Sequence, residues 1–256
     1  MKLINNVNKI VLVVEYDGRR YYGFQWQSKL PTIQAELEKA IHKLTGERRR
    51  VLSASRTDTG VHALGQVVSF RTASRLPPQT VVRALNYYLP EDIAVLSACR
   101  MPDGFNVRRD AVSREYEYRI LNIRVRSPLA EGFMYLVTGK LNMKMMNKAC
   151  QLLKGKQDFA SFAAALEPMK STMRTVYEAK FTRKGDIVTF HMMANSFLPH
   201  QVRNTVGLLI RVGLGKVGID KFKQIMETKK VGLAGPAAPP CGLYLVKVNY
   251  AADLEL

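Results

Sequence analysis

The sequence predicts an α+β protein built from two lobes, each with a mainly antiparallel sheet and helices on one face. First, both halves of the chain show the order strand, helix, strand, strand, helix, strand. Second, a turn-rich break, Met101-Pro102-Asp103-Gly104, separates the two series. Third, 47% of the 256 residues are hydrophobic, enough for a sizeable core. We therefore expect two domains, 1–102 and 103–256.

Hydrophobic periodicity defines the elements of the first domain. Runs of β-branched residues predict strands, and apolar residues at helical spacing predict amphipathic helices. The first helix is capped by Thr32 and ends at Gly46, and the second lies between Pro78 and Pro90. The predicted strands are 9–16, 51–55, 65–72 and 93–99.

The second domain repeats this order, although its residues barely resemble those of the first. Helices are predicted after Asn142, over 200–212 and over 221–228. The predicted strands are 113–120, 176–182, 187–194 and 242–250. This order is typical of RRM-like and ferredoxin-like folds. The repeat predicts a pseudo-two-fold relation, with the active-site cleft between the lobes.

The charge predicts a polyanionic partner. The formal net charge is +18, from 39 Lys and Arg against 21 Asp and Glu, which favours RNA, DNA or an acidic membrane. No apolar run reaches the roughly 18 residues that a membrane span needs. Residues 1–6 lack the apolar core of a signal peptide. We therefore expect a cytoplasmic protein that binds nucleic acid and not a membrane.

Cysteines and histidines give no sign of a metal or a disulfide framework. Cys99, Cys150 and Cys241 are widely spaced and odd in number, and the four histidines are scattered. The His-x-Glu and Cys-x-x-Cys motifs of zinc deaminases are also absent from the sequence. We expect no metal site.

Two basic segments have competing interpretations. Residues 19–27 place arginines beside aromatic rings, a combination that suits single-stranded nucleic acid. A loop whose aromatics cap the core is the alternative. The run Arg48-Arg49-Arg50 is interpreted as a solvated charged face.

The stretch 55–63 joins two predicted strands and contains the first candidate for catalysis, Asp58. Arg56 is two residues away, so on extended backbone the two side chains point the same way. The plainer interpretation is a turn-capping aspartate paired with Arg56.

Two other residues favour a catalytic carboxylate. Arg203 lies in the first turn of an apolar helix, where the helix dipole disfavours a cation without an acidic partner. Tyr116 lies on a strand, and its hydroxyl needs a partner if buried, although a core tyrosine is the commoner case.

Seven motifs give the chain a resemblance to the TruA-type tRNA pseudouridine synthase family over nearly its whole length. Arg56-Thr57-Asp58-Thr59-Gly60-Val61-His62-Ala63 is the most specific of them. The others are Glu15-Tyr16-Asp17-Gly18 with Tyr22-Gly23-Phe24-Gln25, Leu89-Pro90-Glu91-Asp92-Ile93, Arg114-Glu115-Tyr116-Glu117-Tyr118, Asp158-Phe159-Ala160-Ser161-Phe162, residues 197–207, and Gly242-Leu243-Tyr244-Leu245.

The resemblance implies isomerisation of uridine to pseudouridine at positions 38, 39 and 40 of the tRNA anticodon stem-loop. It implies a homodimer that works without metal or cofactor, with one tRNA contacting both subunits. It assigns the catalytic aspartate to Asp58, an active-site tyrosine to Tyr116 and the aspartate-paired arginine to Arg203. Arg56 corresponds to an arginine that holds the flipped-out nucleotide. The chain departs from the family pattern at Phe24, Ser55, Thr59, Ala163 and Pro199.

Two other classes of function remain as alternatives. A non-catalytic RNA-binding module of two RRM-like lobes would bind the anticodon arm without changing the RNA, but the chain lacks a clear RNP1 signature. A metal-dependent nuclease would need clustered carboxylates, and Asp58 is the single strong candidate.

Overall fold

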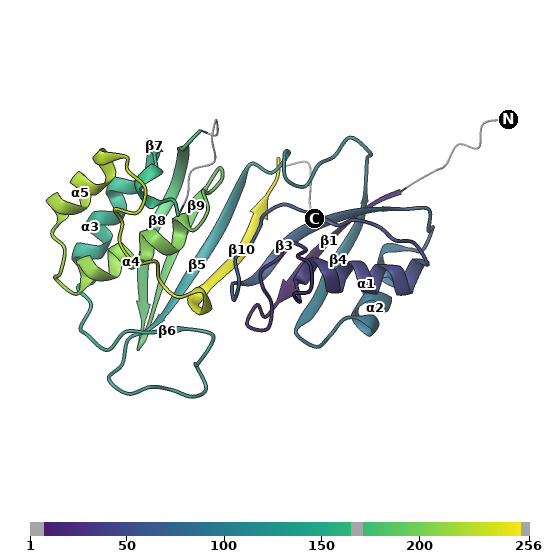
Figure 1. The fold of residues 1–256 in the computed structure, drawn as a ribbon, viewed down its shortest axis with the longest axis horizontal. Coiled ribbons are helices and arrows are strands. Elements are labelled where there is room, and N and C mark those ends of the chain that lie inside the picture. Colours follow the sequence, from purple (N-terminus) through teal and green to yellow (C-terminus); the bar gives the residue numbers. More distant parts are fainter. Residues whose placement is uncertain (1–7, 165–170, 252–256) are drawn as a thin grey trace. The chain divides into compact units, whose positions relative to one another are not determined.

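The structure is a computed structural model that describes residues 8–164 and 171–251. It divides into two compact units, which are described separately: unit 1 is Met1–Val112 with Leu245–Leu256, and unit 2 is Ser113–Tyr244. The described residues form five α-helices and a mostly antiparallel set of strands (Figure 1). This confirms the predicted α+β class. The RRM-like arrangement, the pseudo-two-fold relation and the domain boundary at residue 102 remain predictions.

The strands of unit 1 surround β1 (Asn8–Tyr16), which is antiparallel to both of its neighbours, β3 (His62–Thr72) and β4 (Ile93–Met101). The short β2 (Leu52–Ser53) pairs with the C-terminal half of β3. The last strand, β10 (Leu243–Asn249), is the next neighbour of β3. The strand order in this unit is therefore β4-β1-β3-β10.

Two helices of unit 1 pack against each other, and the second also contacts β4. α1 (Ile33–Thr45) begins as predicted, because the Thr32 side chain accepts a hydrogen bond from the Ala35 amide. It ends at Gly46, which has left-handed backbone. α2 (Pro78–Tyr88) buries Val81 and Leu85. The buried side of α1 consists of Ile33, Leu37, Ala40 and Ile41.

Unit 1 includes two segments that the predicted division placed in the second domain. Residues 103–112 and the final strand residues contact each other: the Val112 amide donates to the Asn249 carbonyl at 2.8 Å. The Tyr250 hydroxyl donates to the Val107 carbonyl at 2.7 Å, and the Tyr250 ring lies 5.3 Å from that of Phe105. Contacts between segments so distant in the chain leave no trace in local patterns.

Unit 2 contains strands in the order β5-β9-β8-β7. β5 (Ser113–Leu121), β9 (Ile187–Ala194), β8 (Met173–Lys184) and β7 (Gly155–Asp158) pair in antiparallel fashion, while the short β6 (Tyr135–Leu136) runs parallel to β5. β8 and β9 form the predicted hairpin. β7 was not predicted, because the sequence Gly-Lys-Gln-Asp has no apolar alternation.

The helices of unit 2 pack together around α3 (Met143–Leu153), which contacts β8, α4 and α5. α4 (Gln201–Gly213) buries most of its length, whereas α5 (Ile219–Thr228) buries Phe222, Ile225 and Met226. Asn142 caps α3 as predicted, its side chain accepting from the Met145 amide. The helix that bears Arg203 is therefore a core helix of this unit.

Candidate active site

Asp58 lies in a loop of unit 1 between β2 and β3, where it is half-buried. The predicted strand 51–55 is shortened to Leu52–Ser53, and β3 starts already at His62. The intervening residues, 54–61, form the Asp58 loop. Arg56 is exposed in this loop. Whether it pairs with Asp58 stays a prediction.

The backbone of the Asp58 loop is fixed by buried polar groups on both sides. The Gln66 side chain is fully buried; its oxygen accepts from the Ser55 amide at 3.2 Å, and its nitrogen donates to the Ser55 carbonyl at 2.8 Å. The Thr57 hydroxyl lies 2.8 Å from that of Tyr16 on β1. The Thr57 carbonyl accepts from the Phe24 amide at 3.0 Å. Each contact satisfies a buried polar group, so the loop conformation is well determined.

The turn after β1 adds an ionised carboxylate beside the loop. Arg19 donates to Asp17 from both Nε and Nη2, at distances of 2.6 to 3.1 Å. His62 is buried, and its Nδ1 lies 3.3 Å from Asp17 Oδ1. Burial would raise the pKa of Asp17, but the hydrogen bonds from Arg19 and the charges of Arg19 and His62 outweigh it, so that pKa lies below its usual value. Asp17 is therefore ionised at neutral pH.

Tyr116 lies on β5 of unit 2 and is 6% exposed. Its ring meets that of Phe197 edge to face, with centroids 5.1 Å apart and planes at 84°. Phe197 precedes α4, so this contact links the Tyr116 strand to the start of the Arg203 helix. Tyr118, two residues along β5, donates its hydroxyl to the Pro239 carbonyl at 2.7 Å.

Arg203 lies in the first turn of α4, as predicted, and is half-buried. Its Nε donates to the Ala238 carbonyl at 2.9 Å, and its own carbonyl accepts from the Ala238 amide at 3.0 Å. The loop that accepts a hydrogen bond from Tyr118 on β5 therefore also forms hydrogen bonds with Arg203. Within unit 2, Tyr116 and Arg203 therefore sit on elements that a shared loop fixes to each other.

The four candidate residues divide evenly between the units. Asp58 and Arg56 share one loop of unit 1, and Tyr116 and Arg203 belong to unit 2. The pairing of Arg203 with Asp58 stays a prediction.

Gln66 was not among the predicted candidates, although it supports the Asp58 loop. The sequence contained a signal for it, because an amide side chain within an apolar strand must find partners if it is buried. Phe197 was predicted only as the first residue of the motif 197–207, and its contact with Tyr116 was not predicted.

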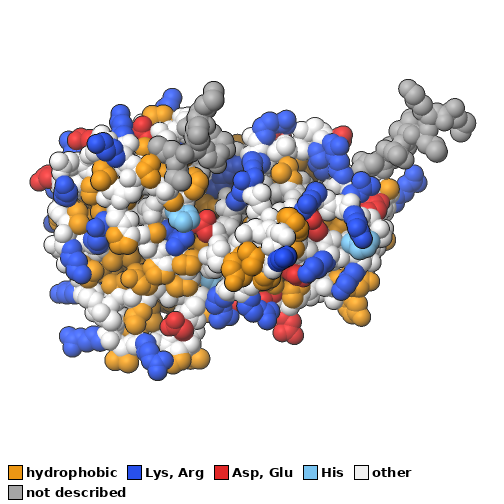
Figure 2. Space-filling model, in the orientation of Figure 1, with side chains coloured by type: hydrophobic (Ala, Val, Ile, Leu, Met, Phe, Trp, Pro, Cys, Tyr) orange, Lys and Arg blue, Asp and Glu red, His pale blue; other side chains and the backbone are white. Residues whose placement is uncertain are grey.

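The described residues contain no group of three or more His, Cys, Asp or Glu side chains placed to hold a metal ion. None of the helices in the part of the chain that the structure describes combines the length and the apolar character of a membrane span. On the face drawn in Figure 2, Lys and Arg side chains are spread widely and acidic side chains are sparse, in keeping with the net charge.

Comparison with known proteins identifies the family of the chain. A family model described as tRNA pseudouridine synthase matches residues 12–110 and 149–251. A tRNA pseudouridine synthase A of Thermoanaerobacter sp. (strain X514) is 41% identical over 244 residues, which cover 95% of this chain and 100% of the relative. A tRNA pseudouridine synthase A of Methylacidiphilum infernorum is 42% identical over 245 residues, covering 95% and 96%. One from Neisseria meningitidis is 41% identical over 240 residues, covering 93% and 91%.

The α+β fold and the net charge of +18 define a globular protein whose surface favours a polyanionic partner. By the extent of the family match and the identity to these relatives, the chain belongs to the tRNA pseudouridine synthase family.

Proposed function

We propose that the chain isomerises uridine to pseudouridine at positions 38, 39 and 40 of the tRNA anticodon stem-loop, with Asp58 as the catalytic carboxylate. The observation that carries the proposal is the conformation of the Asp58 loop. Contacts with Gln66, Tyr16 and Phe24 hold this loop in place, and the chain belongs to this family. A catalytic group must be held in a defined position to act on a bound substrate.

The reaction exchanges one bond to the ribose for another. The C1′–N1 bond breaks, the uracil turns, and C1′ forms a bond to C5. The proton on C5 is lost and N1 gains one, so the product is an isomer and no oxidant or reductant is consumed. A stacked uracil cannot turn, so the nucleotide must first be flipped out of the stem-loop, at a cost of a few kcal/mol. Contacts between the basic surface and the phosphates offset that cost.

Asp58 is assigned the central step of this reaction. An ionised carboxylate at the glycosidic bond attacks the sugar or the base, or removes a sugar proton. The proposal assigns Tyr116, Arg56 and Arg203 to substrate binding. Tyr116 offers a ring for the base, and the two guanidinium groups suit phosphate or carboxylate partners.

The partner and the assembly follow from the same proposal. The substrate is tRNA, the protein works as a homodimer in the cytoplasm, and one tRNA contacts both subunits. Light scattering on the purified protein tests the dimer, with a mass near twice the 28.9 kDa of one chain expected.

The test of Asp58 uses tRNA labelled with tritium at uridine C5. Because that tritium leaves only when C5 bonds to C1′, its release reports the reaction itself. Wild type is expected to release it, and Asp58→Asn should lose activity by at least about 10²- to 10⁴-fold while still binding tRNA. Normal release by Asp58→Asn would refute the assignment.

A further inference from the structure

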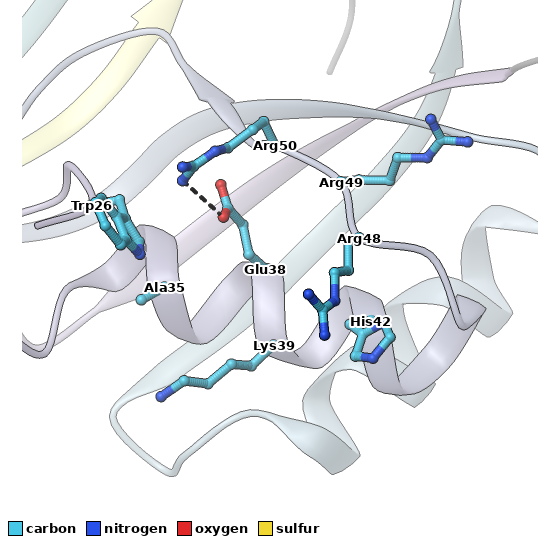
Figure 3. Close-up of a pocket in the computed structure, with 8 residues that line it drawn as sticks. All are labelled: Trp26, Ala35, Glu38, Lys39, His42, Arg48, Arg49 and Arg50. Carbon is cyan, nitrogen blue, oxygen red and sulfur yellow. Dashed lines mark hydrogen bonds and ion pairs between the residues drawn. The ribbon is translucent and has the colours of Figure 1, made fainter. Parts of the chain in front are cut away.

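A basic pocket lies on the outer side of α1 in unit 1, next to the segment that follows β1. Its volume is about 410 Å³, within the range of ligand sites. Trp26 forms one end (Figure 3). The basic side chains that line it are Lys39, His42, Arg48, Arg49 and Arg50. The arginine run, interpreted from sequence as a solvated face, therefore lines a concave surface together with an aromatic ring.

A closed series of contacts fixes the Trp26 end of the pocket. The Trp26 amide donates to the Gln34 side chain at 2.9 Å, and Gln34 donates to Glu38 at 2.7 Å. Glu38 accepts from Arg50 at 3.3 Å, and the Arg50 guanidinium lies over the Trp26 ring at 5.1 Å from its centroid. Figure 3 shows Trp26, Glu38 and Arg50 next to one another beside α1. Trp26 is still 45% exposed, so surface remains for another planar group.

The pocket has an excess of positive charge. Glu38 is the acidic residue that lines it, and it is engaged by Arg50. Arg49 and Lys39 have acidic partners outside the lining, Glu47 and Glu36, each at 2.8 Å. For Arg48, which is exposed, no acidic partner is found among the described residues. A cationic hollow beside a fixed aromatic ring is the arrangement that binds a phosphate and stacks a base.

The pocket is connected to the Asp58 loop through two short segments. Phe24, two residues before Trp26, donates its amide to the Thr57 carbonyl. Arg50 is followed by Val51, whose amide donates to Glu38 at 3.0 Å, and then by β2, which leads into the Asp58 loop. The Asp58 loop and this basic pocket therefore lie in the same unit, where one RNA could contact both.

We propose that this pocket binds an unpaired nucleotide of the RNA substrate outside the catalytic loop. The base stacks on Trp26, and its phosphate contacts Arg48 and Arg50. The inference rests on the proposed function, because it takes the substrate to be tRNA, and it adds a second point of contact for that RNA.

The test uses the fluorescence of Trp26, the single tryptophan of the chain. Full-length Asp58→Asn protein is titrated with unmodified tRNA, so that no turnover occurs. We expect the fluorescence to be quenched as the base stacks.

Trp26→Ala should weaken tRNA binding, measured by filter retention, by about 5- to 150-fold, and Trp26→Phe should restore most of that binding. Arg48→Ala/Arg50→Ala should reduce the slope of log Kd against log salt by about 0.7 to 0.9, because the two arginines contact one phosphate.

The control is Lys221→Ala/Lys223→Ala, which removes two exposed charges from α5 in unit 2. It should leave the Trp26 response to tRNA unchanged. Tight tRNA binding without any change in Trp26 fluorescence would overturn the inference. An equal response to inorganic phosphate or uridine monophosphate at the same concentration would also overturn it, by indicating a free-anion site.

The two proposals fail in different ways. If wild type forms pseudouridine but Trp26 does not respond to tRNA, the pocket inference is wrong and the proposed function stands. If Trp26 responds but no pseudouridine forms, the RNA contact stands and the assigned reaction does not.

Discussion

At the scale of single residues, the position of Asp58 depends on backbone contacts that small side chains permit. Gly23 has left-handed backbone, with φ of 87°, and a Cβ there would meet the Thr57 carbonyl oxygen at 2.7 Å. The Tyr21–Phe24 segment can therefore approach the Asp58 loop only because residue 23 lacks a side chain. The closeness of this segment to Asp58 makes it a sensitive place to perturb the site.

We predict that Gly23→Ala lowers kcat for pseudouridine formation by about 10²-fold, because the added methyl displaces the Asp58 loop. Gly46→Ala is the matched control. Gly46 also has left-handed backbone, with φ of 74°, but an added Cβ meets nothing within 4 Å. Both variants should lose roughly 1–2 kcal/mol of unfolding free energy from left-handed backbone strain, and Gly23→Ala should lose more, because its Cβ also meets the Thr57 carbonyl oxygen. Equal kcat values for the two would show that the contact with Thr57 does not position Asp58.

At the scale of elements, Arg203 depends on how closely α4 packs against the loop that contains Ala238. A Cβ on Gly207 would lie 2.3 Å from the Pro236 carbonyl oxygen. In an exposed helix interior, replacing glycine by alanine stabilises by roughly 0.5–1 kcal/mol. Here the clash reverses the sign of that effect.

Gly207→Ala should therefore lower the free energy of unfolding and, by moving the loop away from Arg203, raise KM for tRNA several-fold. Gly218→Ala, at the cap of α5 with no atom within 4 Å of an added Cβ, should leave KM unchanged. Urea unfolding and steady-state kinetics of the two variants check this. An increase in stability for Gly207→Ala would contradict the packing described here.

A buried cysteine on α3 should make the stability of the protein fall at alkaline pH. Cys150 is fully buried on α3, and burial raises the pKa of its thiol to about 12. A folded pKa above the unfolded one means that the neutral thiol stabilises the fold below about pH 9. That stabilisation is lost as the pH rises from about 9 to 12. We expect the stability difference between wild type and Cys150→Ala to narrow over this range in urea titrations, and a constant difference would contradict it.

Much of the secondary structure could be predicted because apolar spacing and caps are local. Thr32, Asn142 and Gly46 begin or end helices where the sequence indicated. The length of the Asp58 loop could not be predicted. The run from Val51 to Ser55 has strand character, but Ser55 turns away to bond with the buried Gln66 side chain. That partner is 11 residues distant, and only the folded chain shows the contact.

At the scale of the whole molecule, the net charge of +18 governs the encounter with RNA. Each phosphate contact adds about 0.7 to 0.9 to the slope of log Kd against log salt. We predict that tRNA binding weakens by at least about 10³-fold between 50 and 200 mM salt, as for proteins with six or more phosphate contacts. A shallow slope in filter-binding titrations would show that phosphates contribute little to recognition.

The sequence by itself determined the α+β class, most helices and strands, the family and the candidate residues. This was possible because periodicity, helix caps, charge and short motifs depend on residues that are close together in the chain. The tertiary structure alone decided which segments join unit 1, how Gln66 and Tyr16 hold the Asp58 loop, and that Arg48, Arg49 and Arg50 line a pocket with Trp26. These features depend on contacts between residues far apart in the chain, and such contacts are fixed only when the core packs.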